Sequence, residues 1–268
     1  MQIDREQKTT FGRISELYEK TRPSYPQALI DDIITFSSIS QNGKILDVGC
    51  GSGQATLPFA QHGFNVLGID ISQDLVGIAR NKCTKYVKVD FQIAPFEEVK
   101  LPESSVDTIV CGMAWHWIAP EIRYKKAIKL LKQGGTLALF WYHQDKTKST
   151  LVSEIREVFG KHGHAESGPT GTRVHLLVKE ICEELKQNTE FTPIELREYA
   201  EELKYTKEQY LNLISSYGWF QTLTEEKQHA LTKELEQPLK KYEEPLIIPY
   251  KYTLVLAKKN RELQNCLV

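Results

Sequence analysis

Short apolar runs alternate with amphipathic stretches through the first 145 residues of the chain. The apolar runs predict strands. The amphipathic stretches, in which apolar residues are spaced three and four apart, predict helices between those strands. Strands separated by helices imply parallel pairing with right-handed crossovers, and hence a doubly wound α/β sheet with helices on both faces. The strands are expected at 44–49, 64–70, 85–92, 106–111 and 136–143, and the helices at 54–63, 72–83 and 120–135.

Two helix boundaries carry clear signals. Ser72 is a candidate N-cap for the helix at 72–83, because its hydroxyl can accept a backbone N–H of the first turn. The helix at 120–135 has a basic last turn followed by Gly134–Gly135, which predicts that it stops there.

The pattern changes after about residue 145, where helical stretches dominate. A possible strand begins at Phe191, and Thr206 and Thr224 are candidate caps of two later helices. A β-branched and aromatic run at 245–259 predicts a last strand. We therefore expect an N-terminal helical cap at 1–40, a cofactor-binding Rossmann-like core at 41–145, a helical lid insertion with one strand at 146–240, and a final strand and tail at 241–268.

Composition excludes several classes of protein. Basic and acidic residues balance, 34 against 35, and no basic run suggests a nucleic-acid surface. No apolar run approaches the roughly 20 residues of a membrane span, and the N-terminus has no apolar signal core. The five cysteines are scattered without a CxxC pair, and no acidic and histidine cluster has metal-ligand spacing. We expect a cytoplasmic protein with reduced thiols and no metal; its oligomeric state is left open.

A glycine-rich loop carries the first chemical signal. In "LDVGCGSGQAT", Gly49, Gly51 and Gly53 follow a strand and precede a helix. No lysine follows, so the loop is not a P-loop, and Gln54 stands where a dinucleotide fingerprint needs its third glycine. Asp47 lies just before the loop, where a carboxylate disfavours a pyrophosphate and favours a cation or hydroxyls.

A second carboxylate narrows the ligand. Asp70 ends the next strand, and an acid at that position can accept the hydroxyls of a ribose. Together Asp47 and Asp70 indicate a ligand with an unphosphorylated ribose and a positive amino group, and S-adenosylmethionine has both.

Four stretches in order, "LDVGCGSGQAT", "GIDIS", "SSVDTIVCGMAWHW" and "LLKQGGTLALF", resemble the class I S-adenosylmethionine-dependent methyltransferases over residues 44–142. "LYEKTRPSYP", "AWHWI" and the late helical insertion resemble the small-molecule branch that includes trans-aconitate methyltransferase and its fungal relatives. The resemblance implies a seven-stranded, mostly parallel Rossmann-like sheet, S-adenosyl-L-methionine as cofactor and a small-molecule methyl acceptor. No nucleic-acid or membrane partner is implied.

The resemblance also assigns roles to residues. Tyr25, Trp115, His116 and Trp117 would line the acceptor side, with His116 as the catalytic candidate, either a general base or a structural histidine. Arg22 would pair with the cofactor carboxylate or with an acidic substrate. The expected cofactor-binding residues are Tyr18, Arg22, Asp47, Gly49, Cys50, Gly51, Gly53, Asp70, Ile71, Ile93, Ala94, Met113 and Ala114.

One departure from the family concerns the adenine contact. The family often has an acid after the alanine at this point, whereas here Ala94 is followed by Pro95, which has neither a carboxylate nor an N–H. The adenine amino group would then meet a backbone carbonyl near Ile93 or Ala94, or the side chain of Gln92.

These signals lead to three functional hypotheses. The first is in-line methyl transfer to a small-molecule oxygen; a carboxylate nucleophile needs no base, whereas a hydroxyl would need His116. The second is a catalytically silent S-adenosylmethionine-binding regulatory or interaction protein. The third, a nicotinamide oxidoreductase, is opposed by Gln54.

Overall fold

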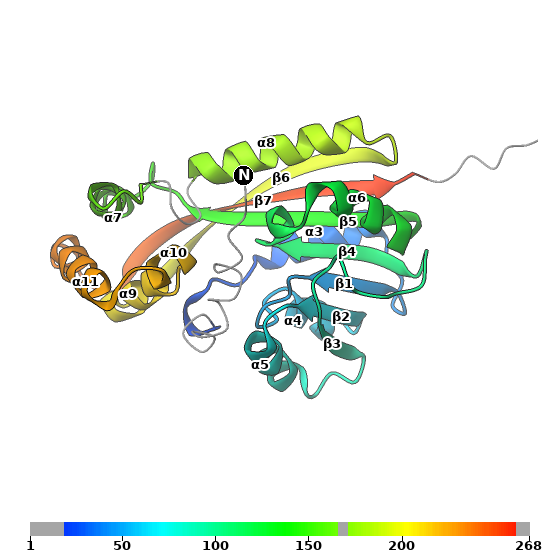
Figure 1. The fold of residues 1–268 in the computed structure, drawn as a ribbon, viewed down its shortest axis with the longest axis horizontal. Helices are drawn as coiled ribbons and strands as arrows, with labels where there is room; N and C mark the ends of the chain where they lie inside the picture. The colour runs from blue at the N-terminus through cyan, green and yellow to red at the C-terminus, as the bar shows by residue number, and fades with distance from the viewer. Residues whose placement is uncertain (1–18, 166–170, 261–268) are drawn as a thin grey trace, which may run out of the picture.

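The seven strands form one twisted sheet in the order β3-β2-β1-β4-β5-β7-β6 (Figure 1). The structure is a computed structural model, and residues 19–165 and 171–260 are described. The first five strands pair in parallel, and β7 runs antiparallel between β5 and β6. The strands are β1 Lys44–Val48, β2 Asn65–Asp70, β3 Val89–Ile93, β4 Val106–Gly112, β5 Leu131–Gln144, β6 Phe191–Tyr205 and β7 Leu246–Lys259.

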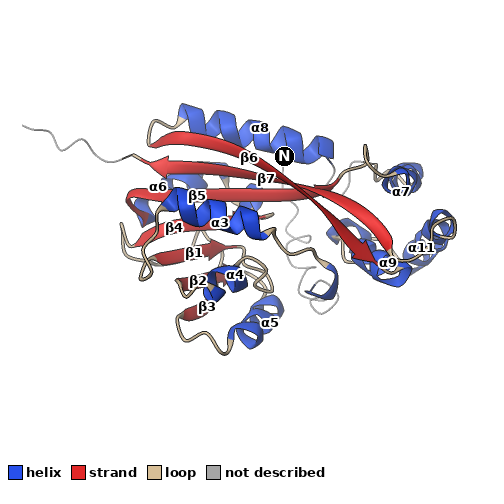
Figure 2. Cartoon of the chain, turned by 180° about the vertical axis from the view of Figure 1, so that it is seen from behind, coloured by secondary structure: helices blue, strands red, loops and turns tan. Residues whose placement is uncertain are grey.

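Helices cover both faces of this sheet, so the predicted fold class is confirmed. They are α3 Gln27–Ser37, α4 Thr56–Gln61, α5 Gln73–Cys83, α6 Pro120–Leu130, α7 Thr150–Lys161, α8 Gly171–Gln187, α9 Lys207–Ser215, α10 Gly218–Gln221 and α11 Glu225–Leu239, with a 3₁₀ turn, η1, at Trp115–Trp117. Helix α3 lies on one face and α6 and α8 on the other (Figures 1 and 2).

Strand β5 builds the core on both faces because its side chains alternate. Phe140 and Tyr142 belong to the apolar cluster that includes α3, whereas Leu139 and Trp141 belong to the cluster with α6 and α8. All four are buried, which is why the stretch reads as a continuous apolar run rather than an alternating one.

Three strands are longer than the rest and carry a second layer of helices. Strands β5, β6 and β7 have 14, 15 and 14 residues, whereas β1 to β4 have five to seven. Their extended ends reach the helices α7, α9, α10 and α11 (Figures 1 and 2). We call these four helices and the turn between α9 and α10 the cap; it is distinct from the N-terminal helical segment expected at 1–40. The cap therefore shares its strands with the half of the sheet that contains β1 to β4.

Two predicted boundaries are wrong. The helix expected to run to Gly134–Gly135 ends at Leu130, because Leu131 is already a strand partner of Val106 in β4. The side chain of Lys132 also forms an ion pair with Asp107 of β4. Sheet pairing outweighs the local glycine signal there. The third strand begins at Val89 rather than at 85. The short helix α10 was not expected.

The described part of the chain contains no helix that is long and apolar enough to cross a membrane. Among the same residues, no three His, Cys, Asp or Glu side chains are grouped in a way that could hold a metal ion. The division into segments at residues 40, 145 and 240 stays a prediction.

Candidate functional site

The glycine loop after β1 has a backbone that few other residues could adopt. Gly49, Gly51 and Gly53 have φ of 68°, 53° and 83°, in the left-handed region. A Cβ on Gly49 would lie 2.4 Å from the Cβ of Ala114, so the loop after β1 packs directly on the loop after β4. The amides of Gly49 and Cys50 donate to the carbonyl of Ile69, at 2.9 and 3.0 Å, which ties the loop to β2.

Asp47 lies at the base of this loop with one carboxylate oxygen unsatisfied. This residue is 1% exposed, and Thr56 Oγ1 donates to its Oδ2 at 2.5 Å, while its Oδ1 has no hydrogen-bond partner among residues 19–165 and 171–260. Burial raises the pKa of Asp47 to about 7, against the lowering effect of the Thr56 hydroxyl. The carboxylate lines a recess together with Tyr25 and Gln54, with about 260 Å³ of open volume counted with its mouth. A buried acceptor without a donor favours a cationic or N–H ligand in that recess.

Asp70 is held differently, by backbone amides. The amide of Gly51 donates to its Oδ2 and the amide of Ser72 to its Oδ1, both at 2.9 Å. Burial raises the pKa of Asp70, and these two amides oppose that shift. Each carboxylate oxygen can still accept a further hydrogen bond, so Asp70 presents two fixed acceptors to the neighbouring cleft.

This cleft lies at the carboxyl ends of β1, β2 and β4 and has about 870 Å³ of open volume, counted with its mouth. Ile71, Leu75 and Phe96 contribute apolar wall, and Glu97 is a second carboxylate at its edge. Met113 has a left-handed φ of 59°, and its Sδ accepts the amide of Tyr142 at 3.2 Å. An apolar cleft with a few fixed polar groups is the usual form of a small-molecule site.

The structure brings most of the predicted residues together. The cleft is lined by Gly49, Gly51, Asp70, Ile71, Ala94, Met113, Ala114 and Trp117, and the recess by Tyr25, Asp47, Gly49, Cys50 and Gly51. Cys50 is 4% exposed and belongs to a small apolar cluster with α5. Gly53 faces Ala79 of α5, and Ile93 is exposed and lines neither cavity. Tyr18 lies outside the described residues.

The structure corrects the prediction that Trp115 lines the acceptor side, because it places this residue in the core. It is fully buried, with its ring centroid 5.8 Å from those of both Phe96 and Tyr124. Successive side chains of a 3₁₀ turn point about 120° apart, so Trp115 enters the core while Trp117 reaches the cleft.

His116 lines neither the cleft nor the recess, which fits the structural alternative better than a general base. Trp141 Nε1 donates to its Nδ1 at 3.4 Å, so the neutral ring carries its proton on Nε2. Burial, with the charges of Arg173 and Arg123, lowers the pKa of His116 to about 3. A group with that pKa is a weak base at neutral pH and a better hydrogen-bond donor.

Arg22 lines neither the cleft nor the recess and contacts the cap instead. Its Nη2 donates to the carbonyl of Ser216 at 3.1 Å, and its guanidinium carbon lies 4.9 Å from the ring centroid of Tyr217. Both partners belong to the cap. The cleft is also lined by Leu75, Phe96 and Glu97, which no pattern in the sequence marked as facing a ligand.

Comparisons with known proteins agree with this geometry. Residues 46–139 match the model of a family described as a methyltransferase domain. An uncharacterized methyltransferase of Mycobacterium tuberculosis is 29% identical over 159 residues, covering 59% of this chain and 62% of that protein. One from Schizosaccharomyces pombe is 26% identical over 224 residues, covering 83% and 84%. A probable S-adenosylmethionine-dependent methyltransferase of Saccharomyces cerevisiae is 31% identical over 150 residues, covering 54% and 50%.

Solved structures share the fold. A putative type II methyltransferase from Anaeromyxobacter dehalogenans has a TM-score of 0.60 at 21% identity, covering 89% of this chain and 97% of that one. A Haemonchus contortus phosphoethanolamine N-methyltransferase, solved with S-adenosyl-L-methionine, has a TM-score of 0.54 at 16% identity, covering 96% and 59%. The match to the mycobacterial relatives covers less than two thirds of their length. The chain has the Rossmann-like methyltransferase fold, and these similarities support a class I S-adenosylmethionine-dependent methyltransferase.

Proposed function

We propose that this protein, built on the class I methyltransferase fold, transfers a methyl group from S-adenosyl-L-methionine to an oxygen atom of a small molecule. The observation that carries the proposal is the pair of carboxylates at the ends of adjacent strands. Asp47 has a buried oxygen to which no group in the described part of the chain donates, and Asp70 presents two fixed acceptors at the cleft. An ammonium group and a ribose diol are the two ligand groups that these acceptors suit.

The residues present fit the whole cofactor. Asp47 would hold the ammonium group in the recess, and Asp70 would accept the ribose hydroxyls. The half-exposed side chain of Ile71 would pack against the adenine, with Leu75 behind it. Because Pro95 has no N–H, the adenine amino group would donate to a backbone carbonyl near Ala94.

When bound, the cofactor supplies a methyl group already activated by a sulfonium. The chain then has to orient the acceptor and exclude water, and orientation alone can lower a barrier by several kcal/mol. Met113, Ala114 and Trp117 form the wall of the cleft beyond β4. The electron-rich face of Trp117 would attract the sulfonium charge. His116 lines neither the cleft nor the recess, so we assign it no part in proton transfer.

The low pKa of His116 favours an acceptor that is already an anion. A carboxylate reacts without losing a proton, whereas a hydroxyl would need a base that His116, with a pKa of about 3, supplies poorly. We therefore favour a carboxylate over a hydroxyl acceptor. The assignment to the small-molecule branch and to the cytoplasm stays a prediction.

Calorimetric titration with S-adenosylhomocysteine and S-adenosylmethionine tests the proposal. We expect both to bind, and Asp70→Asn to weaken binding about tenfold or more, because the neutral amide places an N–H where an acceptor is needed. Asp74→Asn, on the exposed first turn of α5, is the matched control and should bind like the wild type.

Absence of binding to either compound by the wild-type protein would sink the proposal. Incubation with labelled S-adenosylmethionine and a metabolite extract then tests transfer, and label should appear in the methyl ester of a small acid. Binding without any transfer would instead support the silent regulatory protein.

A further inference from the structure

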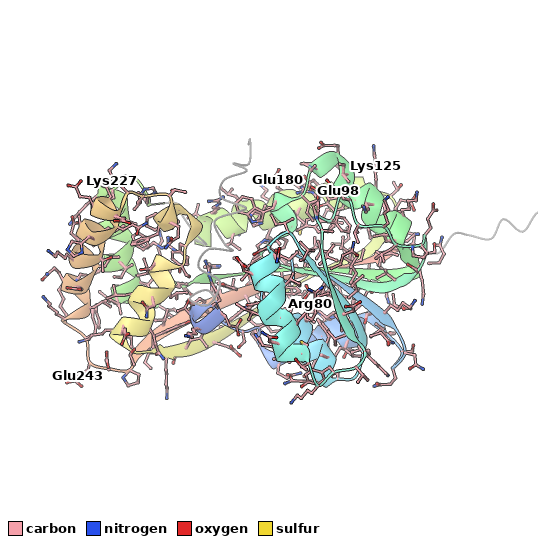
Figure 3. The ribbon with its side chains drawn as sticks, turned by 60° about the horizontal axis from the view of Figure 1, so that its bottom comes forward. Arg80, Glu98, Lys125, Glu180, Lys227 and Glu243 are labelled. Carbon is pink, nitrogen blue, oxygen red and sulfur yellow. The ribbon has the colours of Figure 1, made fainter. Side chains whose placement is uncertain are left out.

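The segment Glu19–Pro26, which we call the strap, connects two parts of the molecule that otherwise lie apart. In Figures 1 and 3 its short helical start, at the blue end of the described chain, lies between α5 and the cap. Figure 3 marks α5 by Arg80. The strap therefore passes beside the cofactor recess before the chain enters α3.

The first end of the strap is fixed to the cofactor side. Glu19 Oε1 lies 2.6 Å from Lys82 Nζ of α5, and Gln54 Nε2 donates to Glu19 Oε2 at 3.3 Å. Gln54 lines the recess that contains Asp47. The side chains of Glu19 and Lys82 are only about a quarter exposed, 26% and 25%, so this ion pair is partly shielded from water.

The second end is fixed to the cap and the long strands. Arg22 contacts the carbonyl of Ser216 and the ring of Tyr217, in the turn between α9 and α10. Tyr252 of β7 donates to the carbonyl of Ser24 at 3.3 Å. The cap and the glycine loop are thus joined through one short piece of chain.

Between these two ends the strap supplies a wall of the recess. Tyr25 packs edge-on against Phe140, with ring centroids 4.5 Å apart, and lines the recess together with Asp47. Its hydroxyl lies 2.3 Å from where a Cβ on Gly112 would stand, so the ring fits closely over the end of β4. Opening the recess on this side requires the strap to move, and moving it loosens the contacts of Glu19 and Arg22.

We propose that the strap couples the cap to the cofactor recess, with Glu19 and Arg22 as positioning residues that set how fast the recess opens. The inference rests on the proposed function, because it takes the recess as the site of the cofactor's amino-acid end. A disturbance of the cap then reaches the cofactor through Arg22, although the cap residues Ser216 and Tyr217 line neither the recess nor the cleft.

The test measures dissociation of S-adenosylhomocysteine by stopped-flow fluorescence, with Trp117 in the cleft as the reporter. Glu19→Lys and Lys82→Glu each place like charges together, and each should speed dissociation about two- to fivefold, the effect expected for a partly exposed pair. The double variant E19K/K82E restores opposite charges and should return the rate to within about twofold of the wild type. A merely structural disturbance would not be rescued by the swap.

A second set of variants tests the coupling to the cap. Arg22→Gln should speed dissociation by a similar factor, and combined with Glu19→Gln the effects should be less than multiplicative, because one displaced end already frees the strap. Glu103→Gln, which breaks an exposed ion pair with Lys129 at 3.0 Å on α6, is the control and should leave the rate unchanged.

The outcomes separate the two proposals. If the wild-type protein binds no S-adenosylhomocysteine, the proposed function falls. If it binds, but the Glu19 and Arg22 variants release the compound at the wild-type rate, or the charge swap fails to restore the rate, the strap inference alone is overturned.

Discussion

Asp47 and Asp70 lie at the ends of neighbouring strands, but their carboxylates accept different hydrogen bonds. Asp70 accepts hydrogen bonds from two backbone amides, which stabilise its charged form, whereas Asp47 accepts one from a hydroxyl and, among the residues described, none at its other oxygen. Burial therefore raises the pKa of Asp47 to about 7, and the negative charge of Asp70 adds to the rise. Asp47 is the group whose ionisation a bound cation would most influence.

This difference predicts a pH dependence of cofactor binding. Below pH 7 the Asp47 carboxyl is protonated in the folded protein and cannot pair with an ammonium group, so binding has to expel its proton. The affinity for S-adenosylhomocysteine should rise by up to about tenfold per pH unit between pH 5.5 and 7, and level off above. Titration calorimetry across pH 5.5 to 8.5 measures it.

Asp47→Asn is the comparison for that experiment, and it should bind weakly with little change across the same range. Ligand-free stability provides a second measurement. The folded pKa of Asp47 lies above its ordinary value of 3.8, so its ionisation penalises the folded state increasingly between about pH 4 and 7. A wild-type affinity that is flat across pH 7 would contradict the assignment of Asp47 to the ammonium group.

At the scale of elements, helix α8 is attached to the core by a charged group as well as by apolar packing. Val178 and Ile181 face the sheet, and the guanidinium of Arg123 on α6 pairs with both carboxylate oxygens of Glu184. Tyr124 also donates to Glu184 at 2.7 Å. The Arg123 side chain is 4% exposed, so its charge depends on that partner.

Glu184→Gln should therefore destabilise the protein by about 2–3 kcal/mol, less than a fully buried pair because Glu184 itself is 27% exposed. Urea unfolding followed by circular dichroism measures the change. Glu180→Gln, one turn earlier on the same helix and exposed (Figure 3), is the matched control and should change stability by less than about 0.5 kcal/mol. Equal effects of the two variants would show that the pairing with Arg123 adds nothing.

At the scale of the whole molecule, the cap and the cofactor-binding half share one sheet. Strand β7 pairs with β5 from Thr136 to Gln144 and with β6 through to Tyr205, without a break between the two halves. One apolar cluster likewise contains residues of α3 and of the cap helices α7, α9 and α11. Neither half can lose its strands without disrupting the other.

The cap and the core should accordingly unfold in a single transition. Trp219 in the cap and Trp141 in β5 both contribute to near-ultraviolet dichroism, and that signal should change at the same denaturant concentration as the far-ultraviolet signal. Two separate midpoints would mean that the cap is an independent unit, joined to the core by its strands alone.

Much of the fold was predictable because its signals are local. The apolar runs of β1, β2, β4 and β5, the Ser72 cap and the left-handed glycines are each set by a few neighbouring residues. The placement of Asp47 and Asp70 follows as well, since the ends of neighbouring parallel strands meet at one edge of the sheet.

The errors fall where distant contacts outweigh local preference. Helix α6 ends before its glycines because Leu131 pairs with Val106 of β4. The 3₁₀ turn orients Trp115 toward the core. Burial beneath other elements, with the charges of Arg173 and Arg123, lowers the pKa of His116, and Trp141 donates to its Nδ1. No pattern near these residues reports such partners.

The sequence by itself determined the order of strands and helices, the shape of the glycine loop and the two carboxylates beside it, because each depends on spacing within a short segment. Only the tertiary structure decided which tryptophan faces the cleft, the proton affinity of His116, and the docking of Glu19 on α5 and of Arg22 on the turn between α9 and α10. The physical reason is that burial, pKa and ion pairing depend on which residues fold against one another.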